Sequence, residues 1–225
     1  MQNYSLSTEK PLLNTWGAKK SAGSWDLILK FDFSNKSVRE HNNWYAETLR
    51  KTLEAFSSIA KSYVISFGST YSVNNKNEVI TLTRSENQSY DTYIGTVSKA
   101  IEQYQQEIDY INIGFDFFVY VYTEKSFPKP TRIWIREFGE SNDLGDMMMQ
   151  LNIEDEEAGI LFSIAHTLFY PFSYPEGEDN SELFELNRPL LKEALKNWEQ
   201  KFNAEIEVDG LPGIYKYGYL PEDQW

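Results

Sequence analysis

Hydrophobic and polar positions alternate with a period of two in several short segments of the chain. In 24–33, SWDLILKFDF, the apolar positions of one face are Trp25, Leu27, Leu29, Phe31 and Phe33. Because successive side chains of a strand point to opposite faces, this alternation predicts a half-buried β-strand. Similar patterns predict strands in 62–73, 78–85, 111–123, 131–138, 147–153 and 158–169.

Two features of these segments bear on how the strands pair. The turn NNKN at 74–77 joins the segments 62–73 and 78–85, which predicts a hairpin. The segment 111–123, INIGFDFFVYVYT, is apolar on both faces. A strand that is buried on both faces is expected near the centre of a sheet.

Other segments repeat apolar residues every three or four positions, which predicts helices. Ser37 and Glu40 have the spacing of a capping box ahead of a helix at 38–60. A second helix is predicted near 90–107. A third is predicted to start near Pro189 and to run to about Asn203.

The order of these elements predicts an α+β fold. Strands follow one another through short turns, so a mostly antiparallel sheet of about six to eight strands is expected, with three main helices packed on it. No segment rich in Pro, Gly and Ser is long enough to separate domains, so a single domain spanning residues 1–225 is expected.

The composition limits the chemistry. The chain has no cysteine, which excludes disulfides, thiolate metal sites and cysteine nucleophiles. The first twenty residues lack the apolar region of a signal peptide, and the apolar run 159–172 is shorter than the roughly 20 residues that cross a bilayer. We therefore expect a cytoplasmic protein.

The charge is distributed unevenly. The sequence has 34 acidic and 21 basic residues, for a net charge of −13. The segment 137–187 holds thirteen of the acids and no Lys or Arg, so the remaining 21 acids equal the 21 bases. This base-free segment carries the entire excess. Partners that are nucleic acids or anionic membranes call for the opposite sign, so neither is expected.

No motif for catalysis or phosphate binding is present. The sequence lacks H-E-x-x-H, G-x-S-x-G, G-x-G-x-x-G and the P-loop pattern. His41 lies at the start of a polar helix face, and His166 lies in an apolar run that is typical of a core position. The acidic clusters do not fit the spacing of a calcium loop. The chain is therefore expected to be non-catalytic, with no metal and no cofactor.

Two acidic clusters inside the base-free segment are the candidate partner-binding residues, together with two tyrosines that flank prolines. They are Glu154, Asp155, Glu156 and Glu157, then Tyr170 and Tyr174, then Glu176, Glu178 and Asp179. Taken singly, each cluster also fits a solvated turn or loop. Asp179 and Glu182 further fit the N-terminal end of a helical turn, where negative charge is favourable. Taken together, the uncompensated charge predicts a surface that attracts a cationic protein.

This profile resembles the immunity proteins of bacterial polymorphic and contact-dependent toxin systems. The resemblance rests on EDEE at 154–157, EGED at 176–179 and the absence of bases between 137 and 187. It implies a small acidic α+β protein that neutralises a basic, nuclease-like toxin domain. It identifies no site residue by itself.

Two other functions use the same residues. The acids could imitate DNA phosphates and inhibit a nucleic-acid-binding protein, although their clustering in loops differs from regular phosphate spacing. Alternatively, a pair of carboxylates among aromatic side chains could form the site of a carbohydrate-active enzyme or a glycan binder.

Overall fold

The computed structural model describes residues 4–9, 23–32, 35–69, 79–136, 145–152, 157–164, 169, 171, 180–209 and 213–220. Its helices are α1 (Val38–Ala55), α2 (Tyr90–Gln103) and α3 (Ser181–Phe202). The longer strands are β1 (Gly23–Lys30), β2 (Ala60–Gly68), β3 (Val79–Thr83), β4 (Tyr110–Val121), β5 (Thr131–Ile135), β6 (Gly145–Asn152) and β7 (Glu157–Ile164). Three short strands follow α3: β8 (Ile206–Asp209), β9 (Ile214–Tyr215) and β10 (Gly218–Tyr219).

The sheet confirms the predicted α+β class. Seven strands lie in the order β3-β2-β4-β6-β7-β1-β8, and β5 pairs with the second half of β4, which makes eight strands in all. All of these pairs are antiparallel, including the predicted β2–β3 hairpin, whose turn at 74–77 falls outside the described residues. The strand β4 is central, as its two apolar faces predicted.

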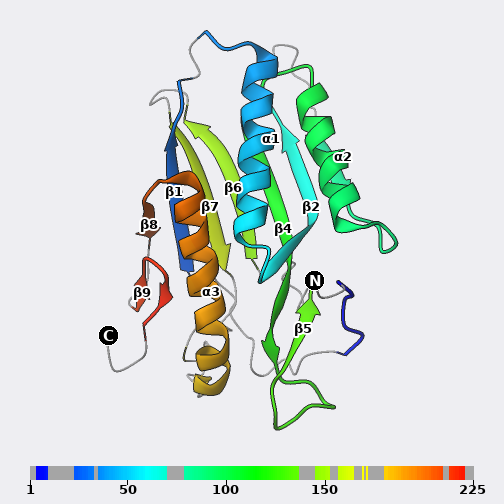
Figure 1. Ribbon diagram of the computed structural model, residues 1–225, viewed down its shortest axis with the longest axis vertical. Coiled ribbons are helices and arrows are strands. Elements are labelled where there is room, and N and C mark those ends of the chain that lie inside the picture. Colours follow the sequence, from blue (N-terminus) through cyan, green and yellow to red (C-terminus); the bar gives the residue numbers. More distant parts are fainter. Residues whose placement is uncertain are drawn as a thin grey trace.

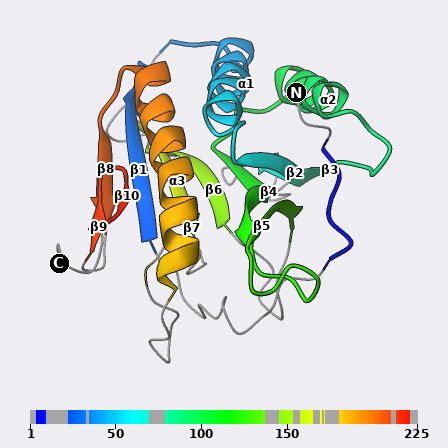
Figure 2. The same cartoon turned by 60° about the horizontal axis from the view of Figure 1, so that its bottom comes forward.

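The three helices lie together on one face of the sheet (Figure 1), with α3 beside β1 and α1 beside α2 (Figure 2). The capping box predicted for α1 is present: the Ser37 side chain accepts from the backbone N–H of Glu40, and the Glu40 carboxylate accepts from the N–H of Ser37. The helix ends at Ala55, five residues earlier than predicted, because 56–59 form a turn and β2 begins at Ala60.

Helix α3 differs from the prediction at its start. It begins at Ser181, eight residues before Pro189, and Pro189 lies inside the helix. A proline has no N–H and so removes one hydrogen bond from a helix interior, whereas nothing is lost in the first turn. The proline therefore predicted a helix start near residue 189. The first turns are held by packing instead, since Leu183, Phe184 and Asn187 are buried.

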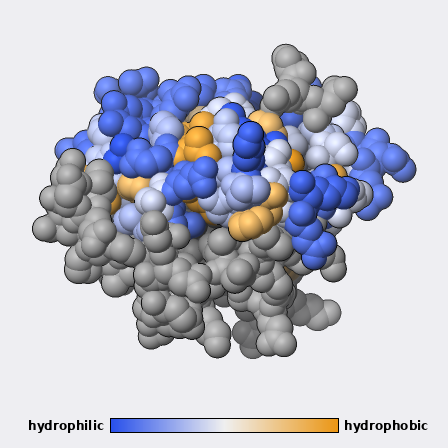
Figure 3. Space-filling model, turned by 90° about the horizontal axis from the view of Figure 1, so that it is seen from below, coloured by the Kyte–Doolittle hydropathy of each residue, from blue (hydrophilic) through white to orange (hydrophobic). Residues whose placement is uncertain are grey.

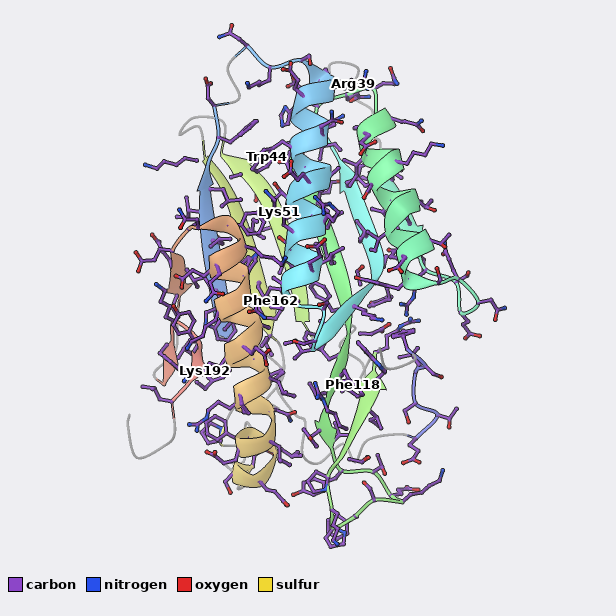
Figure 4. All side chains as sticks on the ribbon, in the orientation of Figure 1. Arg39, Trp44, Lys51, Phe118, Phe162 and Lys192 are labelled. Carbon is purple, nitrogen blue, oxygen red and sulfur yellow. The ribbon has the colours of Figure 1, made fainter. Side chains whose placement is uncertain are left out.

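The core lies between the helices and the sheet and is rich in aromatic side chains. Phe56 packs against Phe162 and Trp198, with ring centroids 4.6 and 5.5 Å apart. Full burial of one such side chain contributes roughly 2–3 kcal/mol. Phe162 on β7 is fully buried, and Figure 4 shows its position in the molecule. Strand β7 pairs with β6 on one side and β1 on the other, so it is an inner strand.

Three smaller findings complete the comparison with the sequence. The edge strand β8 was not predicted, because four residues are too few to show a pattern. His41 is buried against the Tyr45 ring, so its placement on a polar helix face was wrong, while Phe33 and His166 lie outside the described residues. In the described part of the chain, no helix is both long enough and apolar enough to span a membrane.

Candidate functional site

Most of the predicted partner-binding residues lie outside the part of the chain that the structure describes. These are Glu154, Asp155, Glu156, Tyr170, Tyr174, Glu176, Glu178 and Asp179. Only the backbone of Glu157 is placed: it begins β7, opposite Asn152 of β6 on one side and Lys30 of β1 on the other. The connection 153–156 therefore links two adjacent antiparallel strands, while the turn predicted for EDEE falls on residues outside those described.

The described residues that flank the two acidic clusters lie at opposite ends of the sheet. The first cluster follows Asn152 at the end where β1 finishes. The second precedes Asn180 at the start of α3, and this helix begins near the far end of β4 (Figure 1). The eight residues of β7 span about 24 Å between these ends. The two clusters are therefore anchored separately and must be probed separately.

The end of the molecule at which α3 starts brings aromatic and acidic side chains together. Glu182, in the first turn of α3, accepts a hydrogen bond from the Tyr122 hydroxyl. The Tyr122 ring contacts that of Phe127, and Phe127 is 65% exposed. Seen from this end, small hydrophobic areas lie among hydrophilic side chains (Figure 3). Glu182 thus occupies the helix terminus that favours negative charge, as predicted.

A second cluster surrounds the fully buried carboxylate of Asp116, at the middle of β4. Arg136 donates to both of its oxygens, from Nε at 2.8 Å and from Nη2 at 3.1 Å. Arg84 donates from its own Nη2 at 3.3 Å, and the Tyr4 hydroxyl donates to the same oxygen, Oδ2. Two cations and a phenol therefore surround one acid.

Strand register assembles this cluster from distant parts of the sequence. Arg84 follows β3, and Arg136 follows β5, whose last residue pairs with Phe117. Tyr4 arrives from an N-terminal segment, 4–9, that lies along the free edge of β5 (Figure 2). Its ring lies 3.6 Å from the Arg84 guanidinium carbon.

Burial and charge shift the pKa values of these groups. Burial, followed by the hydrogen bond to Asp116, raises the pKa of Tyr4 to about 12. The hydrogen bonds from Arg136 to Asp116 raise the pKa of the Arg136 guanidinium. Both shifts keep the protons on the two donors, Tyr4 and Arg136.

A hollow of about 890 Å³ opens beside this cluster, between the end of α1, the first half of α2, the middle of α3 and the β4–β5 hairpin. The helices contribute the apolar side chains Leu53, Ile94 and Leu190 to its lining. The sheet contributes Lys61, Phe118, Arg132 and Trp134, and Figure 4 shows Phe118 at the lower part of β4. Three carboxylates also line it: Glu54, Asp91 and Glu193.

The sheet side of the hollow is a stack of rings with a cation at each end. Phe118 and Trp134 stack with centroids 5.1 Å apart. The guanidinium carbon of Arg132 lies 4.3 Å from the Phe118 centroid, and Nζ of Lys61 lies 5.5 Å from that of Trp134. Such cation–ring contacts fix the positions of both charges at the hollow.

The residues around the hollow combine positive charge with apolar surface. In the described part of the chain, no group of three or more His, Asp and Glu side chains converges as a metal site would require. The described histidine, His41, is buried, and its burial lowers its pKa. What the hollow offers is a pair of cations beside apolar surface.

The sequence patterns did not predict the Asp116 cluster or the hollow. One signal was present: Asp116 is the one acid in the otherwise apolar run GFDFFVYV, and a buried acid needs partners. Arg132 and Arg136 alternate with apolar residues in TRIWIREF, which placed them on one face of β5. Their convergence required the register between β4 and β5.

The chain was also compared with known proteins. Neither the family models, nor the curated proteins, nor the solved structures contain a match to it.

Proposed function

We propose that this chain is a cytoplasmic, non-catalytic binding protein of the immunity type, which neutralises a basic toxin domain through an acidic surface. The observation that carries the proposal is the base-free segment 137–187, which accounts for the whole net charge of −13. Such a concentration of one sign repels itself and also steers a partner of opposite sign. Interleaved lysines would remove both effects.

The surroundings of α3 support this proposal. Glu182 and Glu185 are the two acids of the segment whose side chains are described, and both are exposed. Glu185 pairs with Arg188, the first base after the segment, and Glu182 accepts from Tyr122.

The same end of the molecule offers an aromatic contact. Phe127 is exposed beside Tyr122 and Glu182, and the second acidic cluster enters α3 at Asn180. Binding hot spots typically combine a large aromatic anchor with charged neighbours. We therefore place the main contact with the toxin at the α3 end and assign the 154–157 cluster a smaller share.

The experiment uses the partner that the proposal expects, a nuclease-like toxin domain encoded beside the gene for this chain, with its nuclease activity disabled by mutation. A triple variant, Glu176→Gln, Glu178→Gln and Asp179→Asn, should associate about tenfold more slowly at low salt, because it loses steering charge. The variant Glu154→Gln, Asp155→Asn and Glu156→Gln should be affected less. Stopped-flow mixing measures both rates.

The matched control neutralises three exposed acids outside the segment and outside the Tyr122–Phe127 contact, namely Glu86→Gln, Glu102→Gln and Glu107→Gln. It removes as much charge and should leave the rate nearly unchanged. Wild-type rates in both cluster variants would refute the proposal. Competition between the chain and duplex DNA for the toxin domain would instead favour DNA mimicry.

The glycan alternative gains little from the hollow. Its two sheet aromatics, Phe118 and Trp134, stack on each other, and their remaining surfaces contact Arg132, Lys61 and Tyr4. These two rings therefore leave no open face on which a sugar could lie.

A further inference from the structure

Lys61 forms no ion pair with Asp116, the acid that faces it on the neighbouring strand. It lies directly opposite Asp116 in the β2–β4 pairing. Cross-strand pairs of opposite charge normally attract each other. Here both oxygens of Asp116 are occupied by Arg84, Arg136 and Tyr4. Among the residues that the structure describes, no carboxylate lies within 4.0 Å of the Lys61 ammonium.

The ammonium of Lys61 is instead surrounded by rings. It lies 5.0 Å from the Tyr90 centroid, 5.4 Å from that of Tyr4 and 5.5 Å from that of Trp134. Ring faces attract a cation but do not neutralise it. Burial and the neighbouring positive charge of Arg84 accordingly lower the pKa of Lys61.

Arg132 is a second cation of the same kind. Its guanidinium donates to two backbone carbonyls, those of Phe118 and Ser58. It forms no ion pair within the described ranges of the chain. Its burial lowers its pKa, as it does for Lys61. Two partly desolvated cations therefore lack a direct counter-ion.

Both cations line the 890 Å³ hollow, at the two ends of the Phe118–Trp134 stack. The acids in the lining do not neutralise them by contact. Glu54 is engaged by Arg50 and Lys201, while Asp91 and Glu193 act on Lys61 and Arg132 through longer-range attraction. The remainder of the lining includes apolar side chains from three helices.

We propose that this hollow binds an organic anion whose carboxylate, sulfonate or phosphate group lies along the Phe118–Trp134 stack, attracted by Lys61 and Arg132 from its two ends, and whose apolar body covers Ile94 and Leu190. The anion would supply the counter-charge that Asp116 cannot provide. The apolar body would bury helix side chains that now face the hollow. The site is independent of the acidic segment and of any toxin partner.

The chain's net charge makes this proposal easy to test. A protein of net charge −13 repels anions in general, so binding of an anion has to come from a local site. Anilinonaphthalene sulfonate is a suitable probe because it joins an anionic group to an aromatic body and fluoresces in apolar surroundings. Its uncharged relative N-phenylnaphthylamine reports on the apolar part alone.

We expect saturable binding of the sulfonate dye to one site. Lys61→Gln and Arg132→Gln should each weaken it about fivefold, because each removes one of the two positive charges that attract the sulfonate. Lys61→Arg should retain most of the affinity. Phenyl phosphate and octanoate should compete, whereas benzyl alcohol should not. Binding of the uncharged dye should be unchanged in all variants.

Lys192→Gln is the matched control, because Lys192 is exposed on α3, on the side away from Phe118 (Figure 4), and does not line the hollow. Its affinity for the dye should equal that of the wild type. The proposal is overturned if Lys61→Gln and Arg132→Gln bind the sulfonate as tightly as the wild type does. It is also overturned if both dyes lose affinity equally, since the charge would then be irrelevant.

Discussion

Two pairs of cations lie on the same face of the β2–β4–β5 sheet, and the fold uses them differently. Arg84 and Arg136 share the buried carboxylate of Asp116. Lys61 and Arg132, close by, contact rings and backbone carbonyls, without an ion pair in the described part of the chain. The difference arises because Asp116 is the one acid among the described residues of β2, β4 and β5, and the two arginines and Tyr4 occupy both of its oxygens.

The comparison separates a structural role from a binding role. The Asp116 cluster ties three segments to β4, namely the N-terminal segment 4–9, the end of β3 and the end of β5. In the described part of the chain, Lys61 and Arg132 form no ion pair that joins one segment to another. Their charge faces a hollow, where it is available to a ligand.

The largest expected effect is the loss of stability when the carboxylate of Asp116 is removed. Replacing Asp116 by Asn leaves Arg84 buried and Arg136 partly buried without an anion. We expect the free energy of unfolding to fall by about 3–5 kcal/mol, the usual cost of breaking a buried ion pair on one side. Urea denaturation of the variant measures it, with Glu102→Gln as an exposed control.

Replacing Lys61 should change the unfolding free energy much less in the same urea experiment. Lys61→Gln removes a cation that has no paired acid, so its unfolding free energy should change by less than about 1 kcal/mol. If Asp116→Asn and Lys61→Gln destabilise the protein equally, the distinction between the two pairs of cations is wrong.

A smaller effect concerns Tyr4 at alkaline pH. Its pKa is raised to about 12, so the folded protein keeps the phenol proton where the unfolded chain has lost it. The stability contributed by Tyr4 is therefore complete below about pH 10 and declines as the pH rises from 10 towards 12. Tyr4→Phe should cost about 1 kcal/mol at pH 8, for one lost hydrogen bond.

The difference between wild type and Tyr4→Phe should then shrink above pH 10. Other buried tyrosines, among them Tyr45 and Tyr93, titrate equally in both proteins and cancel in the difference. Urea midpoints measured at intervals between pH 8 and 12 give the curve. A difference that stays constant across this range would show that the Tyr4 proton is not linked to folding.

The sequence predicted the layers of the fold well, because each layer follows from a local period. Trp25, Leu27 and Leu29 are buried at alternate positions of β1. Ser37 caps α1, as its spacing from Glu40 predicted. The start of α3 was misplaced because the proline signal outweighed the apolar positions Leu183 and Phe184, which continue the helical spacing towards the N-terminus.

The site was less predictable, because it depends on contacts between distant residues. Tyr4 and Asp116 are 112 positions apart, and no local period relates them. The bulge in β2 between Ser62 and Val64 is equally hidden in the sequence, although it lets Val64 and Tyr63 pack over Gly114. A Cβ on Gly114 would lie 2.7 Å from the Val64 side chain, so this glycine is needed for the bulge next to Asp116.

The most direct test of the account is the pKa of the Lys61 side chain, measured by NMR of lysine labelled at the ε-methylene carbon and assigned with Lys61→Arg. We expect a pKa below the ordinary lysine value in the free protein, because burial and Arg84 disfavour the charged form. Adding phenyl phosphate should raise it, since the anion supplies the missing counter-charge. An ordinary pKa that phenyl phosphate does not change would contradict the account.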